Sequence, residues 1–172
     1  MDGYLLDTTI LSAYLVPTHR HHIEVLAAVE DLTAKEYRYI SVVALAELTT
    51  GAEFIEAFDG RFVPAFRERL IRARKHPLLD ISHHTASAYA KLKRAVAEKF
   101  MPEAMKKKAS RKRFVEDWID ETTGKELGID ENDLWMCAQA KERDLILVTD
   151  DKKMVRRIGT ADPDLRLELL GV

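Results

Sequence analysis

Short runs of apolar, β-branched or aromatic residues alternate along the chain with longer segments whose apolar residues recur at helical spacing. The short runs predict strands at 4–6, 37–42, 78–81, 145–149 and 165–169. The longer segments predict helices at 8–15, 22–32, 43–58, 62–75, 83–100, 103–120, 131–143 and 152–158, with Ser82 as the cap of the fifth helix. Strands that alternate with helices indicate an α/β protein, a three-layer α/β/α fold with a short central parallel sheet.

The pattern shows no boundary between domains. A chain of 172 residues has the length of one domain, and no internal repeat, low-complexity segment or linker rich in Pro, Gly or Ser interrupts it. We therefore expect a single domain over 1–172. The most polar and least regularly patterned part is interpreted as a basic helical arm or insertion around 91–126.

The composition excludes a disordered chain, because 47% of the residues are hydrophobic and 33% are charged. No apolar run approaches the ~20 residues that a membrane helix needs, so no membrane contact is expected. The first residues, MDGYLLD, lack the basic residues of a secretory signal. Cys137 is the only cysteine, which excludes an intramolecular disulfide and makes a packed, buried thiol the expected role. These features predict a cytoplasmic protein.

Acidic residues stand at corresponding places in the predicted sheet and helices. Asp7 follows the first strand directly, and Asp150 and Asp151 follow the fourth strand. Glu47 lies about one turn into the helix after the second strand, and Asp133 lies in the first turn of the helix before the fourth strand. Ligands of parallel α/β sheets bind at the carboxyl ends of the strands, so these acids are expected to converge on one pocket.

Each of these acids also has a simpler explanation. Asp7, Asp133 and the pair at 150–151 stand where acids cap helices or favour the helix dipole. Glu47 could be a surface glutamate, although small and apolar residues surround it in ALAELTTG. These explanations can all hold at once, but they leave the shared placement at one edge of the sheet unexplained.

Carboxylates held close together without partners repel one another, and a divalent cation removes that repulsion. Mg²⁺ and Mn²⁺ prefer oxygen ligands, and such an ion can activate a bound water and stabilise charge on a phosphoryl oxygen. The sequence contains no Gly-x-x-x-x-Gly-Lys loop, no paired-cysteine zinc spacing and no Gly-x-Ser-x-Gly elbow. Carboxylate-bound metal acting on phosphate is therefore the chemistry that we expect.

Three segments resemble, in this order, the motifs of PIN-domain ribonucleases: LLDTTILSAYL, SVVALAELTTG and ENDLWMCAQAKERDLILVTDD. The most similar group is the VapC-like toxins of toxin–antitoxin pairs. The resemblance implies a PIN-like fold and a Mg²⁺- or Mn²⁺-dependent endoribonuclease that cleaves RNA phosphodiester bonds. It also implies a homodimer that is neutralised by a cognate antitoxin protein.

The motif match implies which residues carry the chemistry. The expected catalytic acids are Asp7, Glu47, Asp133 and Asp151, of which all but Glu47 are expected metal ligands. The family's last acid usually follows a strand-ending threonine as Thr-x-Asp, which here is Thr149 and selects Asp151, while Asp150 competes for the role. Thr9 stands where the family often has Asn or Ser, and it keeps a hydroxyl.

The middle of the chain is strongly basic. Residues 61–113 carry 16 Lys and Arg against 4 Asp and Glu, a net charge of +12, and the parts on either side each have a net charge of −7. RNA needs cations near a carboxylate cluster that would otherwise repel it. We expect RNA contacts at Lys106, Lys107, Lys108 and Arg111. The basic segments could also form a solvated face or bind an acidic antitoxin segment.

Other clusters and other functions remain as alternatives. His19, His21 and His22 follow Pro17 without a paired metal-ligand motif and are interpreted as part of a solvated loop. A catalytically silent PIN-like module that binds RNA or protein without cutting is the main rival function. A phosphohydrolase with a nucleophilic aspartate after the first strand usually needs a second aspartate two residues on, where this chain has Thr9.

Overall fold

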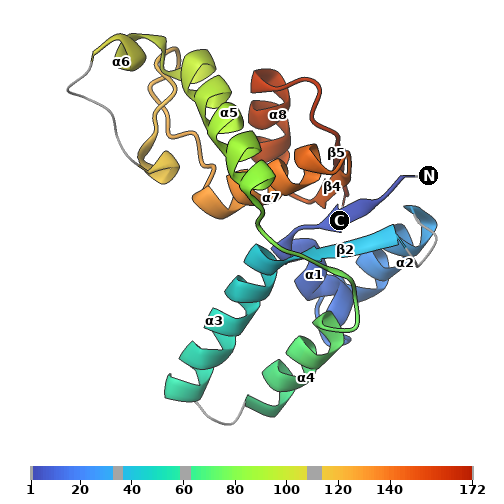
Figure 1. Ribbon diagram of the computed structural model, residues 1–172. Coiled ribbons are helices and arrows are strands. Elements are labelled where there is room, and N and C mark those ends of the chain that lie inside the picture. The colour runs from blue at the N-terminus through green and yellow to red at the C-terminus, as the bar shows by residue number, and fades with distance from the viewer. Residues whose placement is uncertain (1, 33–36, 59–62, 108–113, 172) are drawn as a thin grey trace.

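A parallel sheet of five short strands lies at the centre of the computed structural model, which describes residues 2–32, 37–58, 63–107 and 114–171 (Figure 1). The strands are β1 (Tyr4–Leu6), β2 (Arg38–Ser41), β3 (Leu78–Leu79), β4 (Ile146–Thr149) and β5 (Leu167–Leu169), in the order β3-β2-β1-β4-β5. Every neighbouring pair is parallel. The predicted α/β class and central parallel sheet are confirmed.

Helices cover both faces of this sheet. They are α1 (Thr8–Leu15), α2 (His22–Leu32), α3 (Val42–Phe58), α4 (Val63–Ala73), α5 (His83–Phe100), α6 (Pro102–Lys106), α7 (Glu131–Glu142) and α8 (Lys152–Ala161). A 3-10 turn, η3, spans Val115–Asp117. Helices α1 to α4 lie on one side of the sheet and α5, α7 and α8 on the other, while α3 and α4 extend together away from it (Figure 1).

The neighbouring strands β1 and β4 are apolar because helices cover both faces of the sheet. Leu5 and Leu6 of β1 and Leu147 and Val148 of β4 are fully buried, as expected for a parallel sheet between two helical layers. Leu6 pairs with Val148, and the Asp7 N–H donates to the Val148 carbonyl at 3.0 Å. The residues that follow β1 and β4 therefore emerge side by side at one edge of the sheet.

The prediction of a continuous helix at 103–120 is wrong. The described residues of this range form the short α6 and the 3-10 turn η3, and the chain then folds back so that Ile119 pairs with Glu126 in an antiparallel bridge. The Glu121 carboxylate accepts the N–H groups of Glu103 and Ala104 at 2.8 and 2.7 Å and caps α6. Tertiary contacts of this kind, together with the burial of Val115 and Trp118, override helix propensity in this charged segment.

The polar region at 91–126 divides into two parts. Residues 91–100 complete α5, and Leu92 and Val96 there are buried in the core. The remainder contains α6 and η3, and it is anchored where Val115 and Trp118 are buried. Among the expected RNA contacts, Lys106 and Lys107 are exposed on or beside α6, while Lys108 and Arg111 lie outside the described residues. Within the described residues, no helix is both long and apolar enough to cross a membrane.

Candidate active site

Asp7 leads from β1 into α1 and is almost fully buried, with 6% of its surface exposed. Its Oδ1 accepts the Ile10 N–H at 2.8 Å and the Thr9 hydroxyl at 3.0 Å. Burial raises the pKa of Asp7 to about 6, and the charge of Asp150 adds to this, although hydrogen bonds from Thr149, Ile10 and Thr9 oppose it. Asp7 is therefore both the N-cap of α1 and a carboxyl group whose ionised form is destabilised by burial.

Asp133 occupies the first turn of α7 in a reciprocal capping box with Asp130. The Asp133 N–H donates to Asp130 Oδ1 at 2.8 Å, and the Asp130 N–H donates to Asp133 Oδ2 at 3.0 Å. Burial raises the pKa of Asp133 to about 7, the Asp130 N–H lowers it, and the charges of Asp130, Asp151 and Asp7 raise it further. Three separate carboxylates therefore act electrostatically on Asp133.

The two aspartates after β4 have different surroundings. Asp151 caps α8, because its Oδ1 accepts the N–H groups of Lys153 and Met154 at 2.7 and 3.0 Å. Its own N–H donates to the Thr149 hydroxyl at 3.0 Å. Asp150 is exposed and instead accepts a hydrogen bond from the Thr9 hydroxyl. Of these two aspartates, only Asp151 lies in the same pocket as Asp7 and Asp133.

That pocket has a volume of about 350 Å³ and lies at the carboxyl edge of the sheet, lined by Asp7, Thr9, Glu116, Gly128, Ile129, Asp130, Asp133 and Asp151. The N-termini of α1, α7 and α8 all meet here, each with an aspartate as its cap. The capping explanation and the shared-pocket explanation of these acids are therefore both correct. The partial positive charge of three helix N-termini helps this edge to tolerate the acids.

Glu116 is an acid of the pocket that the sequence did not single out. It belongs to η3, and its Oε1 accepts the Glu131 N–H at 3.1 Å. Its position depends on the burial of Val115 and Trp118 on either side of it, which is a tertiary effect. No local sequence signal connects Glu116 with the ends of the strands.

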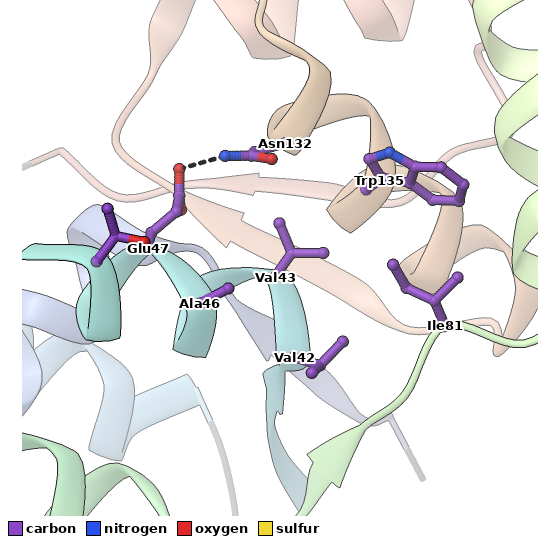
Figure 2. Close-up of a pocket in the computed structure, with 8 residues that line it drawn as sticks. Val42, Val43, Ala46, Glu47, Ile81, Asn132 and Trp135 are labelled. Carbon is purple, nitrogen blue, oxygen red and sulfur yellow. Dashed lines mark hydrogen bonds between the residues drawn. The ribbon is translucent and has the colours of Figure 1, made fainter.

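Glu47 lies next to this pocket rather than in it. Its carboxylate accepts hydrogen bonds from the Thr8 hydroxyl and, at 2.8 Å, from the Asn132 side-chain amide (Figure 2). It lines a neighbouring, more apolar pocket with Val42, Val43, Ala46, Thr50, Ile81, Asn132 and Trp135. The structure thus brings together three of the four expected catalytic acids and places the fourth outside their pocket, bonded to the residues next to Asp7 and Asp133 in the chain.

Within the described residues, no three Asp, Glu, His or Cys side chains lie close enough to form a ready metal site. The donor set nevertheless suits a hard divalent cation, because Asp7, Asp133 and Asp151 offer only carboxylate oxygens. Burial and mutual repulsion raise the pKa of two of them, and a cation would reverse both effects. These three residues fit Mg²⁺ or Mn²⁺.

The fold agrees with that of known structures. The VapBC2 structure from Rickettsia felis bound to a DNA fragment from their promoter has a TM-score of 0.62 and 20% identity, covering 96% of this chain and 97% of that chain. FitAcB from Neisseria gonorrhoeae gives 0.63 and 24%, covering 96% of each chain. VapBC-5 from Mycobacterium tuberculosis, a member of the VapBC family of toxin–antitoxin systems, gives 0.57 and 19% over 100% of both chains.

The comparison with curated proteins gave no match. Identities below 25% establish a shared fold alone, so family membership depends on the sequence model. The PIN domain model matches residues 4–159, from the first residue of β1 into the last turn of α8. Because this match spans most of the chain, including four of the five strands and Asp7, Asp133 and Asp151, the chain belongs to the PIN-domain family.

Proposed function

We propose that the chain is a metal-dependent endoribonuclease and the toxin of a toxin–antitoxin pair. The observation that carries the proposal is the pocket in which Asp7, Asp133 and Asp151 converge, with the pKa values of Asp7 and Asp133 raised to about 6 and 7. Strongly perturbed acids in a pocket are typical of functional sites. The PIN-domain match supports nuclease chemistry at this position.

In this proposal Asp7, Asp133 and Asp151 hold Mg²⁺ or Mn²⁺. When bound, such an ion supplies a more acidic water and a positive charge beside the phosphoryl oxygen. The chain's own residues fix the geometry. The Thr149 hydroxyl hydrogen bonds both Asp7 and the Asp151 N–H, so it holds two of the acids at a set separation.

Glu47 has a positioning role in this proposal. Its bonds to Thr8 and Asn132 link the first turns of α1 and α7, which carry Asp7 and Asp133 at their starts. The raised pKa of Asp133 gives the site a group that changes protonation near neutral pH when no cation is present.

The proposed partners are an RNA substrate, a cognate antitoxin and a second copy of the chain. Relatives in fold such as VapBC-5 are described as toxin–antitoxin systems. Large apolar side chains are exposed on the projecting helices α3 and α4, where Phe54 is 58%, Phe58 is 84% and Ile71 is 59% exposed. Such a surface is typical of protein–protein contacts and supports the two protein partners.

The rival is a PIN-fold module that binds without cutting. The placement of Glu47 outside the acidic pocket, with both of its oxygens hydrogen bonded, favours it. The rival predicts a folded protein that binds RNA but has no metal-dependent activity.

The deciding experiment measures cleavage of a fluorescently labelled RNA pool by the purified chain in Mg²⁺, in Mn²⁺ and in excess chelator. We expect cleavage with either ion and none with chelator, and circular dichroism should show that the fold is retained in all three. Asp133→Asn is the matched negative control. Cleavage that persists in chelator, or that Asp133→Asn leaves unchanged, would mean that the activity does not belong to this site.

A further inference from the structure

A second pocket adjoins the acidic one. It has a volume of about 360 Å³, and Thr9 forms the wall between the two. On the far side of Thr9 its polar lining consists of Thr8, Ser12, His19, Arg20, His21 and Asp150. The acidic pocket thus opens beside a pocket that carries a guanidinium, two imidazoles and hydroxyl groups.

Local hydrogen bonds hold the basic residues against α1. After α1 ends, the His19 N–H donates to the Val16 carbonyl at 2.9 Å, which turns the chain back. His22 Nδ1 then donates to the Ala13 carbonyl at 2.8 Å and fixes the start of α2 beside α1. The segment predicted to be a solvated loop is therefore folded, with His19 and His21 half-buried.

The tautomer of His19 is set by its neighbour. The His21 N–H donates to His19 Nδ1 at 3.2 Å, so the neutral ring carries its proton on Nε2 and can donate it. Burial lowers the pKa of His19, and the nearby positive charges of His21, Arg20 and Arg69 lower it further. The Asp150 carboxylate opposes this lowering, so the charges around His19 are mixed, three positive and one negative.

We propose that this pocket binds a phosphate of the RNA substrate next to the scissile one, with Arg20, His19 Nε2 and the Ser12 hydroxyl as donors. The inference rests on the proposed function and adds a subsite to it. A guanidinium and neutral N–H and O–H donors match the acceptor oxygens of a phosphodiester. Thr9 alone separates this subsite from the acidic pocket, and the subsite supplies the positive charge that RNA needs to approach the acids.

The location distinguishes this subsite from the basic residues that the sequence indicated. Lys106 and Lys107 lie at the end of α6. In Figure 1, α6 lies beyond the end of α5 that points away from the sheet, and it is well separated from α1. Lys106 also forms an ion pair with Glu103 at 2.6 Å. Arg20 is exposed, and it lines a pocket contiguous with the acidic one.

The test compares Arg20→Gln with Lys107→Gln, a matched loss of one exposed positive charge. Both changes are made in the non-cleaving Asp133→Asn chain, and affinity for a labelled single-stranded RNA is measured by fluorescence anisotropy over a series of salt concentrations. For Arg20→Gln we expect about tenfold weaker binding and a slope of log K against log salt that is smaller by about 0.7, the value for one contact to a single strand. Lys107→Gln, at a residue that the sequence also indicated as an RNA contact but that does not line either pocket, should weaken binding by less than Arg20→Gln does.

In the cleaving chain, Arg20→Gln should raise KM and leave kcat nearly unchanged, because a subsite contact is made equally in the ground and transition states. An effect of Lys107→Gln that equals or exceeds that of Arg20→Gln would overturn the subsite. So would an Arg20→Gln chain that binds RNA normally but fails to bind an acidic peptide or an antitoxin. If Arg20→Gln weakens RNA binding in a chain that never cleaves, the proposed function fails and the subsite stands.

Discussion

Replacement of Asp7 by Asn should stabilise the metal-free chain at neutral pH. Asn retains an oxygen that can accept the Ile10 N–H and is as good a helix cap as Asp, so the local structure is preserved. What the replacement removes is a negative charge that is 94% shielded from solvent and lies near Asp133, Asp150 and Asp151.

The size of the effect follows from the pKa. An aspartate in an unfolded chain has a pKa of 3.8, whereas Asp7 in the folded protein has a pKa of about 6. A difference of about two units corresponds to about 3 kcal/mol at most, at 1.36 kcal/mol per unit. Below pH 3.8 the carboxyl is protonated in both states and costs nothing. Between pH 4 and 6 the unfolded chain loses the proton first, so the free energy of unfolding falls, and above about pH 6 the full cost is present.

Thermal unfolding in excess chelator at pH 4 and pH 7.5 measures this directly. The wild-type chain and Asp7→Asn should unfold at similar temperatures at pH 4, and the variant should unfold about 6–12 °C higher at pH 7.5, from roughly 2–4 °C per kcal/mol. Adding Mn²⁺ should raise the melting temperature of the wild type and have much less effect on the variant, because binding stabilises only a folded state that keeps its ligands.

Asp164→Asn is the control, since Asp164 is exposed and remote from the pocket. Its melting temperature should follow that of the wild type at both pH values. The reasoning fails if Asp7→Asn is no more stable than the wild type at pH 7.5 in chelator. It also fails if the two chains differ by the same amount at pH 4 and pH 7.5, because the difference would then come from packing or capping rather than from charge.

Three further predictions concern activity. Asp133→Asn and Asp151→Asn should each lower the rate of RNA cleavage by orders of magnitude, and Asp151→Asn should cost more than Asp150→Asn; the reverse order in the same assay would mean that the wrong aspartate after β4 was selected. Glu47→Gln should reduce kcat while the melting temperature changes by no more than a few degrees, because Gln keeps one acceptor oxygen for Thr8 or Asn132. Expression of the wild-type chain alone should arrest growth, Asp7→Asn should be harmless, and co-expression of the small protein encoded beside it should restore growth; normal growth with soluble, active enzyme would leave a nuclease but remove the toxin.

Local sequence signals were sufficient for much of the fold. The helices expected at 8–15, 22–32 and 83–100 have those same bounds in the structure. Their starts are fixed locally, as where Ser82 Oγ accepts the N–H groups of His84 and Thr85. The alternation of short buried runs with helices predicted a parallel sheet, but the strand order β3-β2-β1-β4-β5 and the pairing of Leu6 with Val148 came only from the structure.

The sequence failed where position depends on residues far away in the chain. The helix expected at 103–120 is interrupted because Val115 and Trp118 are buried and because residues 118–127 fold back. The same turn brings Glu116 to the pocket. The strand ends made Asp7, Asp133 and Asp151 predictable neighbours, whereas the donors that hold Glu47 come from two other helices.

Three of the acids at the edge of the sheet also start helices. Asp7 and Asp151 are N-caps, and Asp133 belongs to a capping box, so losing any of them weakens helix initiation as well as the pocket. Selection for folding alone would keep a capping side chain, Asp or Asn, at these positions in a descendant that no longer cut RNA. Glu47 hydrogen bonds two side chains and caps no helix. Among related sequences, a capping residue retained at these three positions is therefore not proof of activity, whereas loss of the carboxylate at position 7 or at position 47 marks a decayed enzyme.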